Sequence, residues 1–499
     1  SGCNIYINNN PNVLNLDSSA SGDTVTLATI DTGIEGKITY RQTGQKLKIT
    51  GPIKSYGGDI LIDPPTDLLI NETINGGGGS VTAEATGNIT FGTIGFVTTS
   101  GAGNILIQAD VDVDGTGDLA FTNPGTAGGE RVRTTGTGTI QLRGENVVTE
   151  NYSAKTTSGK IEILAGRHST STGEVYSNEL ADGVFDLSAV TFDIEANGAG
   201  IGQSGGNAVN TLEIVSSGQV DAEADGAIHI TSVATNALSV GLIDAGANTV
   251  TLVGNANVRD TGTDAATDVI ATTLTINDGA AGSAGIIRLD TAVTTLNLIG
   301  AAVTIHDGDG VDISFITATS LDLLTTGGIT DSGAVAITNL AKFNSTGNSI
   351  VLGDATAANF GILDFAGSTV TITEASSTQI AASEATGALT LVAAGAITQS
   401  GVIDSISTSS FNAGANTITL TQANDFAGAV SLSHTGTNLV QVTDANAIDL
   451  GTVNVGGALN VTSTGTITDT GNLTVVGLAT LVSGGNAITL GDGTIADFG

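Results

Sequence analysis

Four aspartates in the first quarter of the chain have the type and spacing to bind a metal ion: Asp110, Asp112, Asp114 and Asp118. They belong to the segment DVDVDGTGD, in which carboxylates at positions one, three and five precede a glycine. In calcium loops of the EF-hand type, carboxylates at these positions converge on one ion and a glycine makes a sharp turn. The segment therefore predicts a calcium site formed by the four aspartates.

A plain β-strand is the second interpretation of this segment, and the one that the sequence favours. Phe121 stands where an EF-hand loop places its bidentate glutamate, and no helical pattern flanks the segment. In a strand, Val111 and Val113 would point inward and the aspartates outward, because successive side chains alternate between two faces. Calcium remains the one cofactor that the sequence suggests. A weaker acidic cluster consists of Asp307, Asp309 and Asp312.

Two enzyme-like motifs overlap at residues 200–206. Gly200, Gly202 and Gly205 satisfy G-x-G-x-x-G, but a dinucleotide site also needs a helix after the glycines, and the following residues indicate a strand. Ser204 satisfies G-x-S-x-G. It aligns, however, with a position that varies between Ser and Thr in the repeats described below, which is typical of a turn. The sequence predicts no catalytic residue and no enzyme; the enzymatic alternative is a β-helix that degrades polysaccharides.

Charge and composition exclude several classes of protein. The chain has 499 residues, with 14 Lys+Arg against 49 Asp+Glu, which gives a net charge of −35. Such an excess of negative charge opposes nucleic-acid binding, which needs a basic surface. No apolar run approaches the roughly 18 residues of a transmembrane helix, so no membrane-spanning segment is predicted. The 40% hydrophobic content argues against a disordered chain.

Short apolar–polar alternations follow glycine-bearing turns throughout the chain. Examples are residues 57–63, 86–92, 102–108, 137–143 and 158–164. Alternation with period two is typical of half-buried strands, and many such segments at short intervals predict an all-β fold. Residues 36–51 alternate around a Thr-Gly-Gln turn and predict a β-hairpin.

A longer repeat occupies the C-terminal part. Residues 320–333, 388–401 and 458–471 align without gaps, at spacings of 68 and 70 residues, and a second element follows each of them at 347–361, 415–428 and 485–499. Such internal repeats are typical of solenoids, in which each coil buries its faces only against its neighbours. We predict a parallel β-helix (β-solenoid) with coils of roughly 20–25 residues, so that each repeat holds about three coils.

The same patterns predict three regions. Residues 1–57 form a small β module for capping or docking, 58–190 form irregular solenoid coils, and 191–499 form regular coils that stop within a repeat. An open last coil exposes unpaired backbone groups and aliphatic side chains. If residues 1–57 of another copy cover it, the copies join head to tail into a filament.

The repeated motifs G-x-I-T-[DQ]-[ST]-G and [GA]-N-x-[IV]-x-L resemble the repeats of filamentous-haemagglutinin-type proteins, which are secreted bacterial surface proteins. The resemblance covers residues 190–499 clearly and 58–190 loosely. It implies a right-handed parallel β-helix, secreted or displayed at the cell surface, that acts as a filament, sheath or adhesin stalk. The alternative is an adhesin with a carbohydrate- or protein-binding side face that recognises a host or matrix ligand, for which segments 125–133 and 167–187 are the candidates.

Overall fold

The computed structural model describes most of the chain, which divides into two compact units, Ser1–Ala281 (unit 1) and Gly282–Gly499 (unit 2). All regular elements of the described residues are β-strands, and their inter-coil pairing is parallel. The predicted all-β solenoid is therefore confirmed; its right-handed sense stays a prediction. The described residues are 4–8, 13–18, 24–33, 35–42, 46–63, 66–168, 172–179, 182–202, 211–254, 256–262, 265–277, 285–345 and 347–499.

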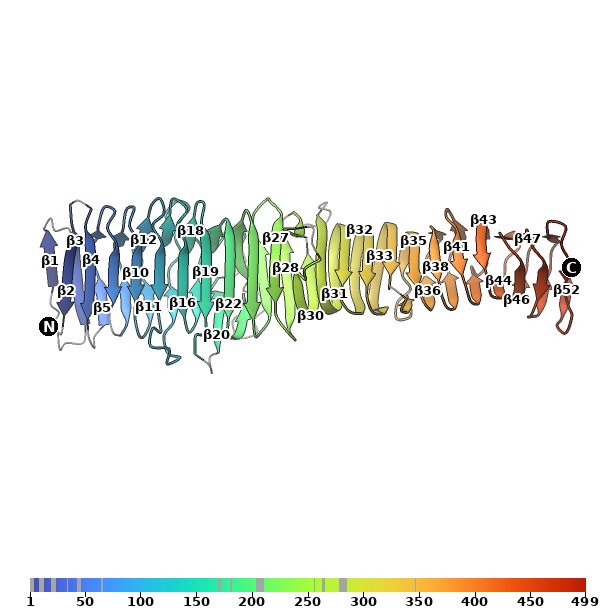
Figure 1. The fold of residues 1–499 in the computed structure, drawn as a ribbon, viewed down its shortest axis with the longest axis horizontal. Coiled ribbons are helices and arrows are strands. Elements are labelled where there is room, and N and C mark those ends of the chain that lie inside the picture. The colour runs from blue at the N-terminus through green and yellow to red at the C-terminus, as the bar shows by residue number, and fades with distance from the viewer. Residues whose placement is uncertain are drawn as a thin grey trace. The chain divides into compact units, whose positions relative to one another are not determined.

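In unit 1 the strands form three parallel ladders, because over most of the unit each strand pairs with the third strand after it (Figure 1). The first ladder contains β2 (Val13–Ser18), β4 (Lys37–Gln42), β7 (Ile60–Asp63), β10 (Val81–Glu84), β13 (Ile105–Gln108), β16 (Ile140–Gly144), β19 (Lys160–Ala165), β22 (Thr191–Ala196), β25 (Gln219–Ala224) and β27 (Leu238–Asp244). The second contains β3 (Thr24–Asp31), β5 (Lys46–Ile49), β8 (Leu68–Ile70), β11 (Ile89–Phe91), β14 (Leu119–Phe121), β17 (Val147–Thr149), β20 (Gly173–Ser177), β23 (Gly198–Ile201) and β26 (Ile228–Ser232). The third contains β6 (Ile53–Lys54), β9 (Thr73–Asn75), β12 (Phe96–Thr99), β15 (Val132–Thr134), β18 (Ala154–Thr156), β21 (Leu187–Ala189) and β24 (Leu212–Ser216). The unit also has β1 (Asn4–Asn8), β28 (Thr249–Gly254), β29 (Val258–Asp260) and β30 (Val269–Asn277).

Unit 2 is also built of parallel strands, and three long strands stand at its start: β31 (Ile286–Asp307), β32 (Val311–Thr325) and β33 (Ile329–Asn344). The strands that follow are β34 (Ile350–Leu352), β35 (Asn359–Gly367), β36 (Val370–Glu374), β37 (Thr378–Ile380), β38 (Ser383–Ala385), β39 (Leu389–Ala393), β40 (Ile397–Gln399), β41 (Ile403–Ser405), β42 (Ser409–Asn412), β43 (Ile418–Phe426), β44 (Val430–His434), β45 (Val440–Asp444), β46 (Ile448–Val455), β47 (Leu459–Ser463), β48 (Ile467–Asp469), β49 (Leu473–Val475), β50 (Ala479–Val482), β51 (Ile488–Thr489) and β52 (Ala496–Phe498).

The core of each unit is a set of inward-facing columns. Ile60, Val81, Ile105 and Ile140 follow one another in register along the first ladder, and all are at most 1% exposed. Buried apolar surface stabilises by roughly 25 cal/mol per Å², so these stacked aliphatic side chains stabilise the contact between neighbouring coils. The alternating pattern of the sequence therefore describes one inward and one outward face per strand.

The predicted hairpin at residues 36–51 is wrong. β4 and β5, which lie on either side of its turn, do not pair with each other: β4 pairs in parallel with β2 and β7, and β5 with β3 and β8. β4 and β5 therefore belong to two different ladders. Strand pairing runs across residue 57, and the boundaries at residues 57 and 190 stay predictions.

An asparagine at the same point of each repeat secures a coil corner, just before β34, β43 and β51. Asn348 Nδ2 donates to the carbonyl oxygens of Thr326 in the preceding coil (2.8 Å) and Ser345 in its own corner (3.0 Å). Asn416 and Asn486 make the equivalent pairs of bonds. Two residues before Asn416, Gly414 has φ +56°, a conformation that favours glycine.

One sequence repeat holds slightly more than the predicted three coils. Ile397 and Ile467 are equivalent positions one repeat apart. Three strand pairings lead from β40, which contains Ile397, through β43 and β45 to β47, and Ile467 lies one strand further along the chain, on β48. Since β47 pairs in turn with β50, the third strand after it, one coil holds three strands. One repeat therefore spans three and one third coils of about 20 residues, and successive repeats place the same sequence on successive faces of unit 2.

Spin-label distances would test this one-third turn. Thr390 and Asn460 are equivalent in sequence, but Thr390 lies on the ladder of β36, β39 and β42, whereas Asn460 lies on the ladder of β43, β45 and β47. With Cys3 replaced by serine, labels at 390 and 460 should lie clearly farther apart than their axial separation of about 16 Å, because part of the coil width is added. A distance near 14 Å, which is three coil spacings of about 4.8 Å, would instead support three coils per repeat.

Candidate functional site

A buried carboxylate recurs once in each repeat of unit 2. Asp307, Glu374 and Asp444 follow the pattern V-x-[IV]-x-[DE], at spacings of 67 and 70 residues, and are at most 3% exposed. Each accepts the main-chain N–H of the residue two positions later, with distances of 2.8 Å for Asp309, 3.2 Å for Ser376 and 2.6 Å for Asn446. Each also accepts an N–H from the preceding coil, that of Val293, Phe360 or Phe426, at 2.9–3.2 Å.

Burial makes the charged form of these carboxylates unfavourable. It raises the pKa of Glu374 to about 7, although hydrogen bonds from Phe360 and Ser376 lower it in part. Burial likewise raises the pKa of Asp307 and of Asp444 above the usual value, again against the N–H groups that bind them. The three carboxylates thus hold consecutive coils together at the same point of each repeat, at an electrostatic cost that protonation relieves.

This role is not predicted by the sequence patterns described above. Asp307 was placed in an acidic cluster with Asp309 and Asp312, but its carboxylate points into the coil and is bound by Thr291 Oγ1 (2.7 Å), Val293 N and Asp309 N. Asp309 and Asp312 do not join it in a convergent group among the described residues. The signal in the sequence was the recurrence of an acidic residue directly after V-x-[IV]-x in all three repeats.

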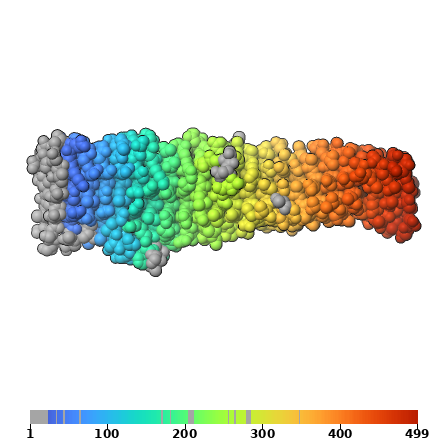
Figure 2. Space-filling view, in the orientation of Figure 1, coloured from blue at the N-terminus to red at the C-terminus, as the bar shows by residue number. Residues whose placement is uncertain are grey.

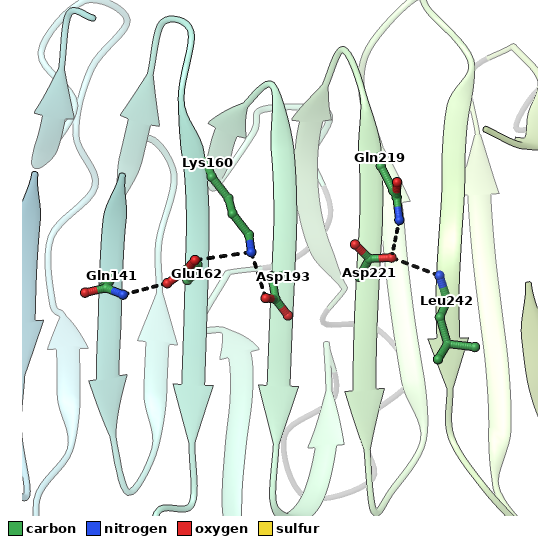
Figure 3. Close-up of polar contacts among 7 residues, drawn as sticks. All are labelled: Gln141, Lys160, Glu162, Asp193, Gln219, Asp221 and Leu242. Carbon is green, nitrogen blue, oxygen red and sulfur yellow. Dashed lines mark hydrogen bonds and ion pairs between the residues drawn. The ribbon is translucent and has the colours of Figure 1, made fainter. Parts of the chain in front are cut away.

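An outward polar ladder lies on the first face of unit 1 (Figure 3). Lys160 Nζ bridges the carboxylates of Glu162 (3.2 Å) and Asp193 (2.8 Å), which are neighbours on β19 and β22. Gln141 Nε2 donates to Glu162 Oε2 at 2.6 Å. Partial burial alone would raise the pKa of Glu162, but the bonds from Gln141 and Lys160 lower it overall.

The ladder continues where no lysine is present. Asp221, beside Asp193 in register, accepts from Gln219 Nε2 (2.7 Å) and from the main-chain N–H of Leu242 (2.9 Å) (Figure 3). Stacked acidic residues are thus separated by amide and ammonium donors. This relieves like-charge repulsion between neighbouring coils.

An aromatic and basic group lies on the third face of unit 1, on β15 and β18 and the connections beside them. Arg133 and Lys155 are register neighbours, each with a side chain 34% exposed, and both lie near the buried Glu130. The ring of Phe185 makes an edge contact with Tyr152 (4.9 Å between centroids) and lies under Lys155 Nζ (5.6 Å). Figure 2 shows unit 1 broadened on one side in its light-blue to teal part.

The loop between β13 and β14 contains the four aspartates of the predicted calcium site. The plain-strand interpretation is wrong: residues 109–118 form no strand, Val111 and Val113 are half-buried, and Asp110 is fully buried. Carboxylate oxygens of Asp110, Asp112 and Asp114 lie within 4.8 Å of one another.

Asp118 lies apart from those three. Its Oδ1 accepts from the main-chain N–H (3.2 Å) and Nδ2 (2.8 Å) of Asn146 in the next coil. It therefore belongs to an inter-coil contact at the start of β14. Calcium binding by the group stays a prediction.

The overlapping enzyme motifs are only partly visible. Ser204 and Gly205 lie outside the described residues. Gly200 belongs to β23, and the next described element is the strand β24. A dinucleotide site requires a helix at that place.

Within the part of the chain that the structure describes, no helix is long and apolar enough to cross a membrane.

Comparison with known proteins identifies the repeat. Residues 300–363, 367–433 and 436–498 match a family described as repeats of unknown function (DUF5649). No curated protein and no solved structure matches the chain. The three matched segments follow one another at the period of the Asp307, Glu374 and Asp444 contacts, so the family repeat corresponds to three and one third coils of β-solenoid.

The buried carboxylates predict a pH dependence of stability. Between pH 4.5 and 7 the unfolded chain loses the Glu374 proton while the folded chain keeps it, so stability should fall as the pH rises through this window. The shift corresponds to at most about 3 kcal/mol. Unfolding of the E374Q variant, followed by circular dichroism from pH 4 to 8, should show a smaller decrease than the wild type.

The control is E384Q, which removes the same charge from an exposed position on β38. The free energy of unfolding of E384Q should decrease with rising pH as steeply as that of the wild type. If E374Q and E384Q have equal slopes, the burial of Glu374 does not cause the pH dependence.

Proposed function

We propose that this chain is a structural segment of an extracellular surface protein, such as a filament, sheath or adhesin stalk. The observation that carries the proposal is the parallel pairing of consecutive coils, in which the same asparagine and carboxylate contacts recur with each repeat. A fold of this kind lengthens by the addition of repeats, because each coil needs only its neighbours for stability.

The charge distribution supports an exposed, soluble surface. The net charge of −35 lies mainly on outward positions, where donors such as Lys160 and Gln219 separate the carboxylates. High net charge of one sign keeps elongated β-proteins from associating laterally. The resemblance to secreted surface proteins points in the same direction. Head-to-tail association of copies stays a prediction from the sequence.

Surface labelling tests the proposal. Antibodies raised against unit 2 should stain intact cells of the producing organism, and a brief external protease treatment should abolish the signal. A cytosolic marker that stays unstained controls for cell integrity. Staining that appears only after lysis would contradict an extracellular role.

A second candidate function is adhesion through the side of unit 1. Arg133 and Lys155, with the adjoining rings of Tyr152 and Phe185, form a basic and aromatic surface on a strongly acidic chain. Cationic groups beside aromatic rings suit an acidic carbohydrate, which needs both charge pairing and a flat apolar contact. This group includes part of the segments that the sequence singled out for ligand binding.

Binding to an immobilised acidic polysaccharide should decrease in R133Q/K155Q and weaken with added salt. The control K46Q/K48Q removes two positive charges from β5, on a different face. Equal loss of binding in both variants would show that the overall charge of the protein, and not this group of residues, determines its binding to the polysaccharide.

A further inference from the structure

Three carboxylate oxygens of the described residues are buried without a hydrogen-bond partner, and they differ in their surroundings: Asp110 Oδ2, Glu130 Oε2 and Asp331 Oδ2. Glu130 has Arg133 and Lys155 at 3.4–3.7 Å. Asp331 takes part in no convergent group among the described residues. Only Asp110 combines an unpartnered buried oxygen with two further carboxylates that converge on it.

Asp110 has no exposed surface and lies in the connection between β13 and β14 of unit 1. Its Oδ1 accepts the main-chain N–H groups of Asp114 (3.0 Å) and Gly115 (3.3 Å), whereas its Oδ2 accepts none. Arg167 donates to the main-chain carbonyl oxygen of Asp110 (3.3 Å), and none of the ion pairs of the described residues includes its carboxylate. A buried carboxylate oxygen with no donor is costly, and a bound cation removes that cost.

The separation of the three carboxylates suits one particular ion. Calcium binds oxygen ligands at 2.3–2.6 Å, so two ligands on opposite sides of the ion lie roughly 4.8 Å apart. The oxygens of Asp110, Asp112 and Asp114 lie within that limit of one another. Asp112 and Asp114 are exposed, which leaves room for water molecules to complete the six to eight ligands that calcium accepts.

We propose that Asp110, Asp112 and Asp114 bind one calcium ion, with Asp118 excluded from the site. Asp110 supplies the buried ligand, and Asp112 and Asp114 close over the ion from the solvent side. The bound ion fixes the loop that leads from β13 into β14. This inference is independent of the proposed surface function, because it rests only on the geometry of the loop.

Calorimetric titration of the full chain with calcium chloride, after removal of divalent ions by a chelator, is the direct test. The wild type should bind one ion at this site, and its melting temperature should rise with calcium. In D112N/D114N, affinity should fall at least about tenfold, because the number of charged ligands sets calcium affinity. Asp110 is left intact in this variant, since its burial makes substitution a risk to folding.

A chain of charge −35 attracts calcium non-specifically, so the control must remove equal charge elsewhere. D404N/D425N does so at two exposed aspartates that are register neighbours on β41 and β43. This control variant should keep the calcium affinity of the wild type, and calcium should raise its melting temperature by the same amount. The proposal is overturned if the wild type shows no calcium-dependent change at millimolar calcium, or if the two double variants lose affinity equally.

Discussion

The parallel pairing of each coil with the next is the constraint on which the rest of the structure depends. Main-chain hydrogen bonds between coils fix their spacing at about 4.8 Å and hold equivalent positions in register. A residue that faces inward, such as Val370, therefore contacts the inward residues of the coils before and after it, Ile350 and Leu389. Any polar group at an inward position must find its partner within the same two or three coils.

The buried carboxylates show how this constraint admits charge into the core. Asp307, Glu374 and Asp444 each lie where a corner offers N–H groups from two coils at once, and an ion pair is not needed to satisfy them. The cost is visible in the pKa of Glu374, which burial raises to about 7. Because the same corner sequence recurs with each repeat, the same contacts recur, and the repeat is recognisable by its polar contacts as well as by its aliphatic columns.

Patterns of period two were sufficient to predict the strands and the solenoid, because alternation reports directly on inward and outward faces. They could not separate a coil corner from a hairpin turn: residues 36–51 alternate on both sides of a turn in either case, and only the partners of β4 and β5 distinguish them. Nor could the sequence show that Asp110 points inward while Asp112 and Asp114 remain exposed. An aspartate that follows a strand ordinarily lies in a solvated turn, so Asp307 and Asp110 were both expected at the surface.

The fractional number of coils per repeat has a consequence for any surface that unit 2 presents. A residue that recurs with each repeat, such as Thr390 and Asn460, moves to the next face of the solenoid each time. It returns to the same face only after three repeats, which is ten coils or about 48 Å along the axis. An integral number of coils would align all copies on one face and concentrate their charge or apolar character there. With three and one third coils, each of three faces carries the same motifs at one third of the density, so a partner that recognises a repeated motif can approach from any of them.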